Sequence, residues 1–209
     1  MSNKTLKDTI EQLENLFGVF NKTYFENQLS KPIVTVSPDT TKGAYGWCTS
    51  WKAWKEAGHE DSGYYEINIC AEYLSRSYEE VAETMLHEMV HLYNLEEGVK
   101  DTSRAGTYHN KKYKEAAEAH GLNVEKDEKY GWTKTSLTED SKAVVENFMK
   151  EIGKTSFDLY REKPEEVEKT AKKSNSIKYV CPCCGIIVRA TKVVNIKCFD
   201  CDELMEADI

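Results

Sequence analysis

The segment Met85–Tyr93 reads Met-Leu-His-Glu-Met-Val-His-Leu-Tyr and contains a His-Glu-x-x-His pattern. On an α-helix, residues four apart turn through about 400°, so the imidazoles of His87 and His91 emerge about 40° apart and can bind one metal ion. Glu88 lies about 100° around the helix from His87, where it can reach a metal-bound water but is poorly placed as a third ligand. The pattern therefore predicts a helix that carries a zinc site of the hydrolytic type.

Two local signals indicate that this segment is helical. Ser77 and Glu80 are spaced as a capping box, in which each side chain accepts a hydrogen bond from the backbone amide of the other. An apolar stripe at three- and four-residue spacing follows, made of Ala82, Met85, Leu86, Met89, Val90 and Tyr93. The opposite, polar side carries Thr84, His87, His91 and Asn94. The alternative is that two histidines and a glutamate lie on a solvated helix face and bind no metal.

The composition limits the size and class of the protein. A chain of 209 residues is long enough for one well-buried domain and a small second module. Its net charge of −8 argues against a protein whose whole surface binds nucleic acid or anionic membrane. No apolar run is long enough to span a membrane, and the first residues lack the apolar region of a secretory signal. We therefore expect a cytoplasmic protein whose cysteines stay free or bind metal.

The pattern upstream of the motif predicts one helix and a small sheet. Apolar residues recur at helical spacing over 6–25. Residues 33–36, 43–49 and 64–70 have the composition of strands, and the polar stretch 50–63 is expected to be a loop. Together with the helices downstream, these elements predict an α+β fold.

Four side chains in this region have two interpretations each. We expect Trp51 and Trp54 to pack on the sheet, and the alternative is that they contact substrate. Cys48 and Cys70 lie at strand ends without a Cys-x-x-Cys partner, so we expect buried, small apolar residues rather than metal ligands.

Downstream of the motif, the sequence predicts two more helices. Residues 94–106 are expected to form a loop, and a helix over 107–120 would then place His109 in its first turn. A further helical pattern lies within 137–160 and is broken at Gly153. We expect a main domain over 1–160 and a charged linker over 161–175.

A catalytic zinc usually takes three protein ligands and leaves the fourth position for water, so the two motif histidines need a partner. We favour His109, because the loop before it is long enough to fold the following helix back over the first. The other candidates are His59, Glu115, Glu118 and His120. Glu115 and Glu118 keep open a site of two histidines and one carboxylate.

A second zinc site is predicted near the C-terminus, in a module over 176–209. The spacing of a structural four-cysteine site is present in Cys181, Cys184, Cys198 and Cys201. Cys183 is an alternative ligand that would shorten the first knuckle to Cys-x-Cys. Residues 186–188 and 193–197 are expected to form the strands of a zinc ribbon, with Gly185 in a tight turn. A module this small would not fold without its metal.

The same region carries a run of basic residues. No acid interrupts Lys169, Lys172, Lys173, Lys178, Arg189, Lys192 and Lys197. This local positive charge suggests contact with DNA or with a partner. The alternative is that these side chains solvate the linker and offset the charge of the four-cysteine site. The acids that follow, from Asp200 to Asp208, weaken the patch.

The combination of motifs resembles the SprT-like family of zinc metallopeptidases. The resemblance rests on the His-Glu-x-x-His pattern, the loop after it, the run Gly-Thr-Tyr-His-Asn-x-x-Tyr over 106–113 and the terminal ribbon. It covers most of residues 5–125 and the ribbon. Many members have glycine directly after the third histidine, where this chain has Asn110.

This resemblance implies a zincin-like core, with helices packed on a small sheet, and specific roles. His87, His91 and His109 would bind a catalytic zinc, and Glu88 would be the catalytic acid and base. Some members, of the Spartan type, cleave proteins crosslinked to DNA, which implies that the ribbon here recruits DNA or a protein partner.

The leading hypothesis is therefore a zinc-dependent endopeptidase with an appended zinc ribbon. The competing hypothesis is a non-catalytic zinc-binding factor associated with nucleic acid or transcription. Glu88 favours the enzyme, because a purely structural site needs no carboxylate beside a bound water. An extended peptide substrate could pair with the strand over 64–70, provided that this strand lies at a sheet edge.

Overall fold

The computed structural model describes residues 4–40, 43–163 and 176–208, and the chain divides into two compact units, Met1–Lys163 and Pro164–Ile209. Most of the predicted linker, with Lys169, Lys172 and Lys173, lies outside the described residues. Among the described helices, none has both the length and the apolar character needed to cross a membrane. The fold is mixed α+β, as predicted, with four α-helices and several small sheets in the described part of the chain.

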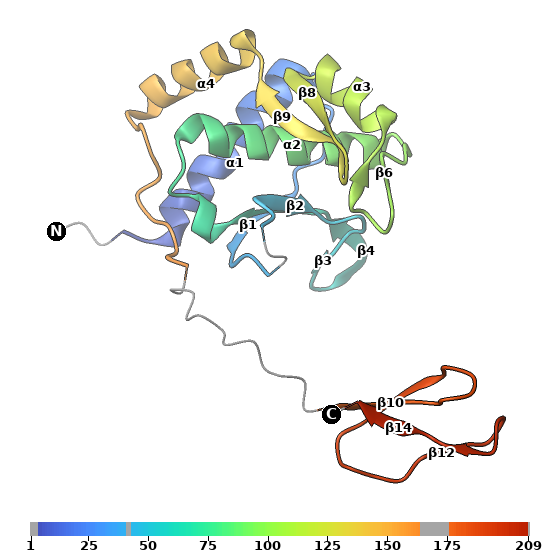
Figure 1. The fold of residues 1–209 in the computed structure, drawn as a ribbon. Helices are drawn as coiled ribbons and strands as arrows, with labels where there is room; N and C mark the ends of the chain where they lie inside the picture. Colours follow the sequence, from blue (N-terminus) through green and yellow to red (C-terminus); the bar gives the residue numbers. More distant parts are fainter. Residues whose placement is uncertain (1–3, 41–42, 164–175, 209) are drawn as a thin grey trace. The chain divides into compact units, whose positions relative to one another are not determined.

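The first unit is built around the motif helix α2 (Tyr78–Glu96). Its predicted capping box is confirmed: the Glu80 amide donates to the Ser77 hydroxyl at 3.2 Å, and the Ser77 amide donates to the Glu80 carboxylate at 2.9 Å. Figure 1 shows α2 passing between the sheet that contains β1 and β2 and the strands β8 and β9. Because neighbours cover several sides of α2, even the polar Thr84 and Asn94 are buried.

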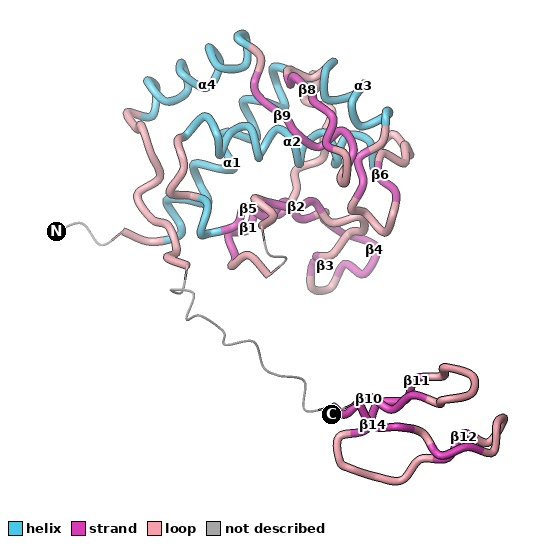
Figure 2. The backbone as a smooth tube through the Cα atoms, in the orientation of Figure 1, coloured by secondary structure: helices cyan, strands magenta, loops and turns pink. Residues whose placement is uncertain are grey.

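The sheet on one side of α2 has the order β1-β5-β2 (Figure 2). Strand β1 (Ile33–Ser37) runs parallel to β5 (Glu66–Cys70), and β2 (Gly46–Cys48) pairs antiparallel with β5 on the other side. The predicted strand over 64–70 is therefore central in the sheet. Both edges of β5 are occupied, so the hypothesis that a substrate pairs with this strand is wrong.

The segment expected to be a loop over 50–63 contains a hairpin instead. Strands β3 (Trp54–Glu56) and β4 (His59–Tyr64) pair with each other in a separate two-stranded sheet. Trp51 is 64% exposed and Trp54 is 45% exposed, so the expectation that they pack on the sheet is wrong. The indole of Trp54 donates to the Glu66 carboxylate at 2.6 Å. Trp54 is the first residue of this hairpin and Trp51 lies in the segment before it, so neither belongs to the β1-β5-β2 sheet.

Two helices complete the core of the first unit. Helix α1 (Leu6–Tyr24) buries one apolar face against α2, as its periodicity predicts. Helix α4 (Glu139–Ile152) ends at Gly153, whose φ of 64° is the left-handed conformation common at helix C-termini. The core joins side chains from α1, α2, α4 and the β1-β5-β2 sheet. Cys70 is buried and Cys48 is partly buried, and neither belongs to a metal-ligand cluster of the described residues.

On the other side of α2 lies a four-stranded sheet of order β6-β7-β9-β8. Its two long strands, β8 (Leu122–Asp127) and β9 (Gly131–Leu137), were not predicted. The short strands are β6 (Thr102–Ser103), within the segment expected to be a loop, and β7 (Tyr108–His109). Helix α3 (Lys111–Ala119) connects β7 to β8.

The second unit has two small sheets. Strand β10 (Ile177–Val180) lies between β11 (Ile187–Ala190) and β14 (Glu206–Asp208). Strand β12 (Lys197–Cys198) pairs with β13 (Glu203–Leu204). The predicted strand over 193–197 is wrong except at its last residue: β12 begins at Lys197, and just before it the Ile196 carbonyl accepts from the Met205 amide at 2.8 Å. The predicted turn at Gly185 is confirmed: its φ is 73° and its amide donates to the Cys181 carbonyl at 2.9 Å.

Candidate functional site

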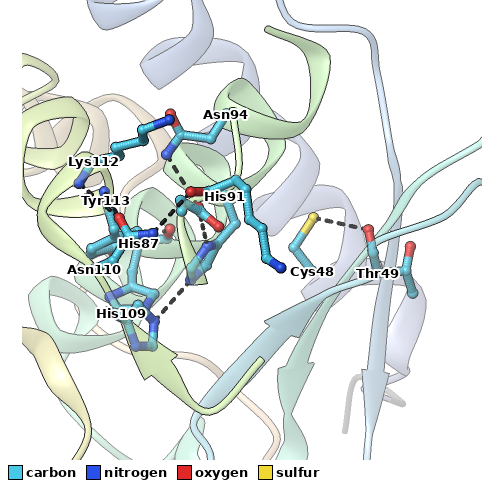
Figure 3. A network of polar contacts seen from close by, with 11 residues as sticks. Cys48, Thr49, His87, His91, Asn94, His109, Asn110, Lys112 and Tyr113 are labelled. Carbon is cyan, nitrogen blue, oxygen red and sulfur yellow. Dashed lines mark hydrogen bonds and ion pairs between the residues drawn. The ribbon is translucent and has the colours of Figure 1, made fainter. Parts of the chain in front are cut away.

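Three partly buried histidine side chains converge in the first unit (Figure 3). His87 and His91 lie four residues apart on α2, and His109 reaches them from β7. The Nε2 atom of His109 lies 3.2 Å from Nε2 of His87 and 3.0 Å from Nε2 of His91. The residues that the sequence proposed as a ligand set are thus brought together.

This arrangement fits a metal ion. Three Nε2 atoms bound to one tetrahedral zinc, each at about 2.0–2.1 Å, would lie about 3.3 Å apart, close to the separations seen here. Three ring nitrogens that face one another with lone pairs repel unless a cation lies between them. Burial lowers the pKa of His87 and lowers that of His109 to about 4, and charge on His91 adds to both effects. Both rings therefore stay neutral, which is the form that binds metal.

The outer nitrogen of His91 contacts a carboxylate. Its Nδ1 lies 2.7 Å from Oδ2 of Asp101, which also accepts from the Asn94 amide at 3.1 Å. Burial lowers the pKa of His91, but the bond to Asp101 and the nearby carboxylate of Glu88 outweigh it, so the net shift is upward. For Asp101, burial alone would raise the pKa. The bond to His91 outweighs burial, so the net shift of the Asp101 pKa is downward. An ionised Asp101 accepts from Nδ1–H and leaves the His91 Nε2 lone pair facing the cluster.

His109 is held by backbone pairing rather than by a helix. It pairs with Thr102 of β6 and with Gly131 of β9, and its amide donates to the Tyr130 carbonyl at 2.9 Å. The prediction that His109 lies in the first turn of a helix is wrong. The reason is Asn110, whose side chain accepts from the amides of Lys112 at 2.7 Å and Tyr113 at 3.3 Å, so the helix starts after it.

Gly131 leaves no room for a side chain beside His109. A Cβ atom there would lie 2.2 Å from the His109 carbonyl oxygen, and the φ of Gly131 is +77°. We expect Gly131→Ala to lower the free energy of unfolding by more than about 2 kcal/mol, because β7 must move away from β9. Chemical denaturation of the metal-free protein measures this. Gly98→Ala is the matched control, since Gly98 has φ +67° but nothing within 4 Å of the added Cβ. Equal losses in both variants would contradict the predicted clash.

Tyr113 of α3 lies against all three rings. Its ring centroid is 4.9, 4.6 and 4.7 Å from those of His87, His91 and His109. Burial raises its pKa, and its hydroxyl donates to the His87 carbonyl at 3.5 Å. Tyr113 therefore packs under the cluster as a neutral phenol.

Glu88 is buried on α2 beside the cluster, with 6% of its surface exposed. Burial raises the pKa of Glu88 to about 7, although the nearby His91 and the Cys48 backbone act in the opposite direction. Strand β2 covers this part of the helix closely: a Cβ on Gly46 would lie 3.1 Å from Thr84 Cγ2 and 3.5 Å from Glu88 Cγ. The arrangement leaves Glu88 able to take up and release a proton near neutral pH.

The other residues considered as third ligands lie elsewhere. His59 is exposed on β4. Glu115 and Glu118 are exposed on α3, where Glu118 pairs with Lys114 at 3.5 Å. His120 ends α3 and stacks on Phe25, with ring centroids 4.4 Å apart.

In the second unit, the four predicted cysteines form one cluster. The Sγ atoms of Cys181, Cys184, Cys198 and Cys201 all lie within 4.8 Å of one another. Sγ of Cys184 is 3.8 Å from Sγ of Cys198, and tetrahedral zinc–sulfur bonds of about 2.3 Å would place two sulfurs roughly 3.8 Å apart. Cys183 is exposed and lies outside this set. The cluster fits a structural zinc ion.

The sequence did not point to Asp101, Gly131 and Thr135, although each contacts a cluster histidine through its side chain or backbone. Asp101 lies in a short loop, and the other two lie on the unpredicted strand β9. No spacing rule connects them to the motif. Only the glycine before an apolar and Thr-rich run offered a signal that a strand begins at Gly131.

The model of the SprT-like family matches residues 13–130, which include the C-terminal part of α1, all of α2 and the three cluster histidines. No curated protein and no solved structure matches the chain. The matched residues make up more than half of the chain, and the match ends just before β9.

Proposed function

Because the chain belongs to the SprT-like family, we propose that it is a zinc-dependent endopeptidase with a zincin-like core over 1–160, joined through a linker over 161–175 to a zinc ribbon over 176–209. The observation that carries the proposal is the convergence of three Nε2 atoms beside a buried glutamate on the same helix. His87, His91 and His109 would hold the catalytic zinc, and the four clustered cysteines would hold a structural one.

In this mechanism, Glu88 carries the proton. A zinc ion held by the three histidines would acidify a bound water and polarise the peptide carbonyl. The Glu88 carboxylate would accept a proton from the attacking water and donate it to the amine of the leaving product. Burial supports both steps, because a pKa of about 7 lets one carboxyl group act first as base and then as acid near neutral pH.

Strand β2 is the edge that we propose for the substrate, in place of β5. It is one of the two edge strands of the β1-β5-β2 sheet, and it packs on the part of α2 that carries Glu88. An extended peptide paired with β2 would gain main-chain hydrogen bonds while it lies over the motif helix. Trp51, which is exposed two residues after Thr49, lies close in sequence to this edge and could contact such a peptide.

Metal content tests this proposal. We expect two zinc ions per chain, and one in a variant that carries His87→Ala and His91→Ala, because the cysteine cluster would keep its own. A chelator that removes the first zinc should abolish cleavage of a denatured protein substrate, and added zinc should restore it. A wild-type protein that holds only one zinc, or that cleaves equally well without metal, would contradict the proposal.

Contact with DNA, suggested by Lys172, Lys173, Lys178, Arg189, Lys192 and Lys197, stays a prediction. Acids lie beside some of these bases: Lys197 pairs with Asp202 at 2.5 Å, and β10, which carries Lys178, pairs with the acidic strand β14. These neighbours weaken the local positive field. We also propose that the protein acts in the cytoplasm on DNA-associated proteins.

A further inference from the structure

The outer nitrogen of His87, Nδ1, is part of a series of hydrogen bonds that differs from the one at His91. Nδ1 of His87 lies 3.2 Å from the Thr135 hydroxyl, which in turn donates to Oε1 of Glu83 at 2.7 Å. Glu83 lies on α2 one turn before His87, whereas Thr135 comes from β9, 48 residues further along the chain. Two side chains of one helix are thus connected through a hydroxyl of a distant strand.

The chemistry of these groups determines the direction of each hydrogen bond. A threonine hydroxyl has one proton, and here Glu83 accepts it. The Thr135 oxygen can therefore only accept from His87, so Nδ1 of His87 carries its proton. In a neutral imidazole whose Nδ1 carries the proton, Nε2 has a free lone pair. This Nε2 atom faces the His109 ring. The chain of bonds selects the tautomer that can bind a metal ion.

Strand β9 contacts the cluster at a second point, four residues earlier. Gly131 pairs with His109, and its backbone approaches so closely that it leaves no space for a Cβ. One strand thus supports His109 through its backbone and His87 through a side chain. Both supporting residues lie beyond the end of the family match at residue 130.

From these contacts, we propose that Glu83 and Thr135 are positioning residues that hold His87 in its metal-binding tautomer, and that β9 is part of the metal site. This inference rests on the proposed zinc site. The Thr135 hydroxyl contacts His87 and Glu83, so we assign it a role that it exerts through His87. Loss of such an outer partner typically weakens metal binding 10- to 100-fold.

Metal affinity of the full chain tests the proposal. Cobalt titration separates the two sites, because only the cysteine cluster gives thiolate-to-cobalt charge-transfer bands. We expect Thr135→Val to weaken binding at the histidine site about 10- to 100-fold, and Thr135→Ser to restore it to within about threefold. Thr133→Val, the same change two residues earlier on β9, is the matched control and should bind cobalt as the wild type does.

A double-mutant cycle tests whether Glu83 acts through Thr135. Glu83→Ala removes the acceptor of the Thr135 proton, so the Thr135 hydroxyl can rotate and cobalt binding should weaken. In a Thr135→Val background, the same change should have no further effect. Equal effects of Glu83→Ala in both backgrounds would overturn the relay. If Thr135→Val binds as tightly as Thr133→Val while His87→Ala loses the site, the relay is wrong and the metal site stands. A wild-type chain without cobalt at the histidines would instead refute the site itself.

Thermal unfolding of the metal-free variants shows whether a loss of cobalt binding is caused by unfolding of the protein. Thr135→Val should stay folded without metal but melt below Thr133→Val, because it loses the hydrogen bonds of Thr135 to His87 and Glu83. If Thr135→Val is too unstable to be compared with Thr133→Val, the cobalt affinities of Thr135→Ser and Glu83→Ala test the proposal. Failure of Thr135→Ser to restore affinity, with its fold intact, would also overturn the proposal.

Discussion

Replacement of Glu88 by glutamine should reduce peptide-bond cleavage by about 10²- to 10⁴-fold while both metal sites stay occupied, because a carboxamide cannot take the proton from water. Glu88→Gln should fold at least as well as the wild type. Burial already penalises the charged carboxylate, which is the main cause of its raised pKa, and the neutral amide removes that penalty. Cleavage of a denatured protein, measured together with zinc content, checks both parts of this prediction.

Glu97→Gln is the matched control, because Glu97 is exposed at the end of the same helix. It should leave both cleavage and zinc content unchanged. Unchanged cleavage by Glu88→Gln would show that another group handles the proton. A simultaneous loss of zinc would show instead that Glu88 supports the metal site rather than the reaction, and the mechanism proposed for it would be wrong.

The second large effect is expected in the ribbon unit, where Cys184→Ser should remove one zinc and unfold the unit. Its buried apolar cluster is small, with Tyr179, Cys181, Cys198 and Met205 as the buried members. A core of this size cannot offset the chain entropy of folding, so metal binding must supply the difference. Amide hydrogen exchange over 176–208 should accelerate at least about 100-fold, while exchange in the first unit stays unchanged.

The neighbouring Cys183 provides the matched control for this experiment. Both thiols are exposed and adjacent in sequence, but only Cys184 belongs to the cluster of four. Cys183→Ser should keep the zinc and the slow exchange. If Cys183→Ser loses zinc and Cys184→Ser does not, the first knuckle uses the alternative Cys-x-Cys spacing.

Local patterns predicted several elements correctly because the physical cause is itself local. The capping box at Ser77 depends on atoms within one helical turn, and the end of α4 at Gly153 depends on one backbone angle. The ribbon cysteines were found for the same reason, since two short knuckles place their thiols within a few residues. Elements without such signals were missed or misplaced, as with the β3–β4 hairpin and the strands β8 and β9.

For His109, one property could be predicted from the sequence and another could not. Its identity as a cluster member was predicted from its distance along the chain, but its secondary structure was not. The sequence suggested a helix start, whereas pairing with Gly131 places His109 in a strand, and Asn110 begins the helix one residue later. A histidine can point at the same centre from either conformation, so the motif alone could not decide between them.

Residue chemistry and helical spacing are properties of short segments, so the side chains that can bind metal, and the helix that carries two of them, could be predicted from the sequence. How those side chains are held depends on contacts between distant segments. Asp101, Thr135 and Gly131 contact the cluster from a loop and a strand that no spacing rule connects to α2. Long-range packing brings them there, and it also buries Glu88 deeply enough to change its proton affinity.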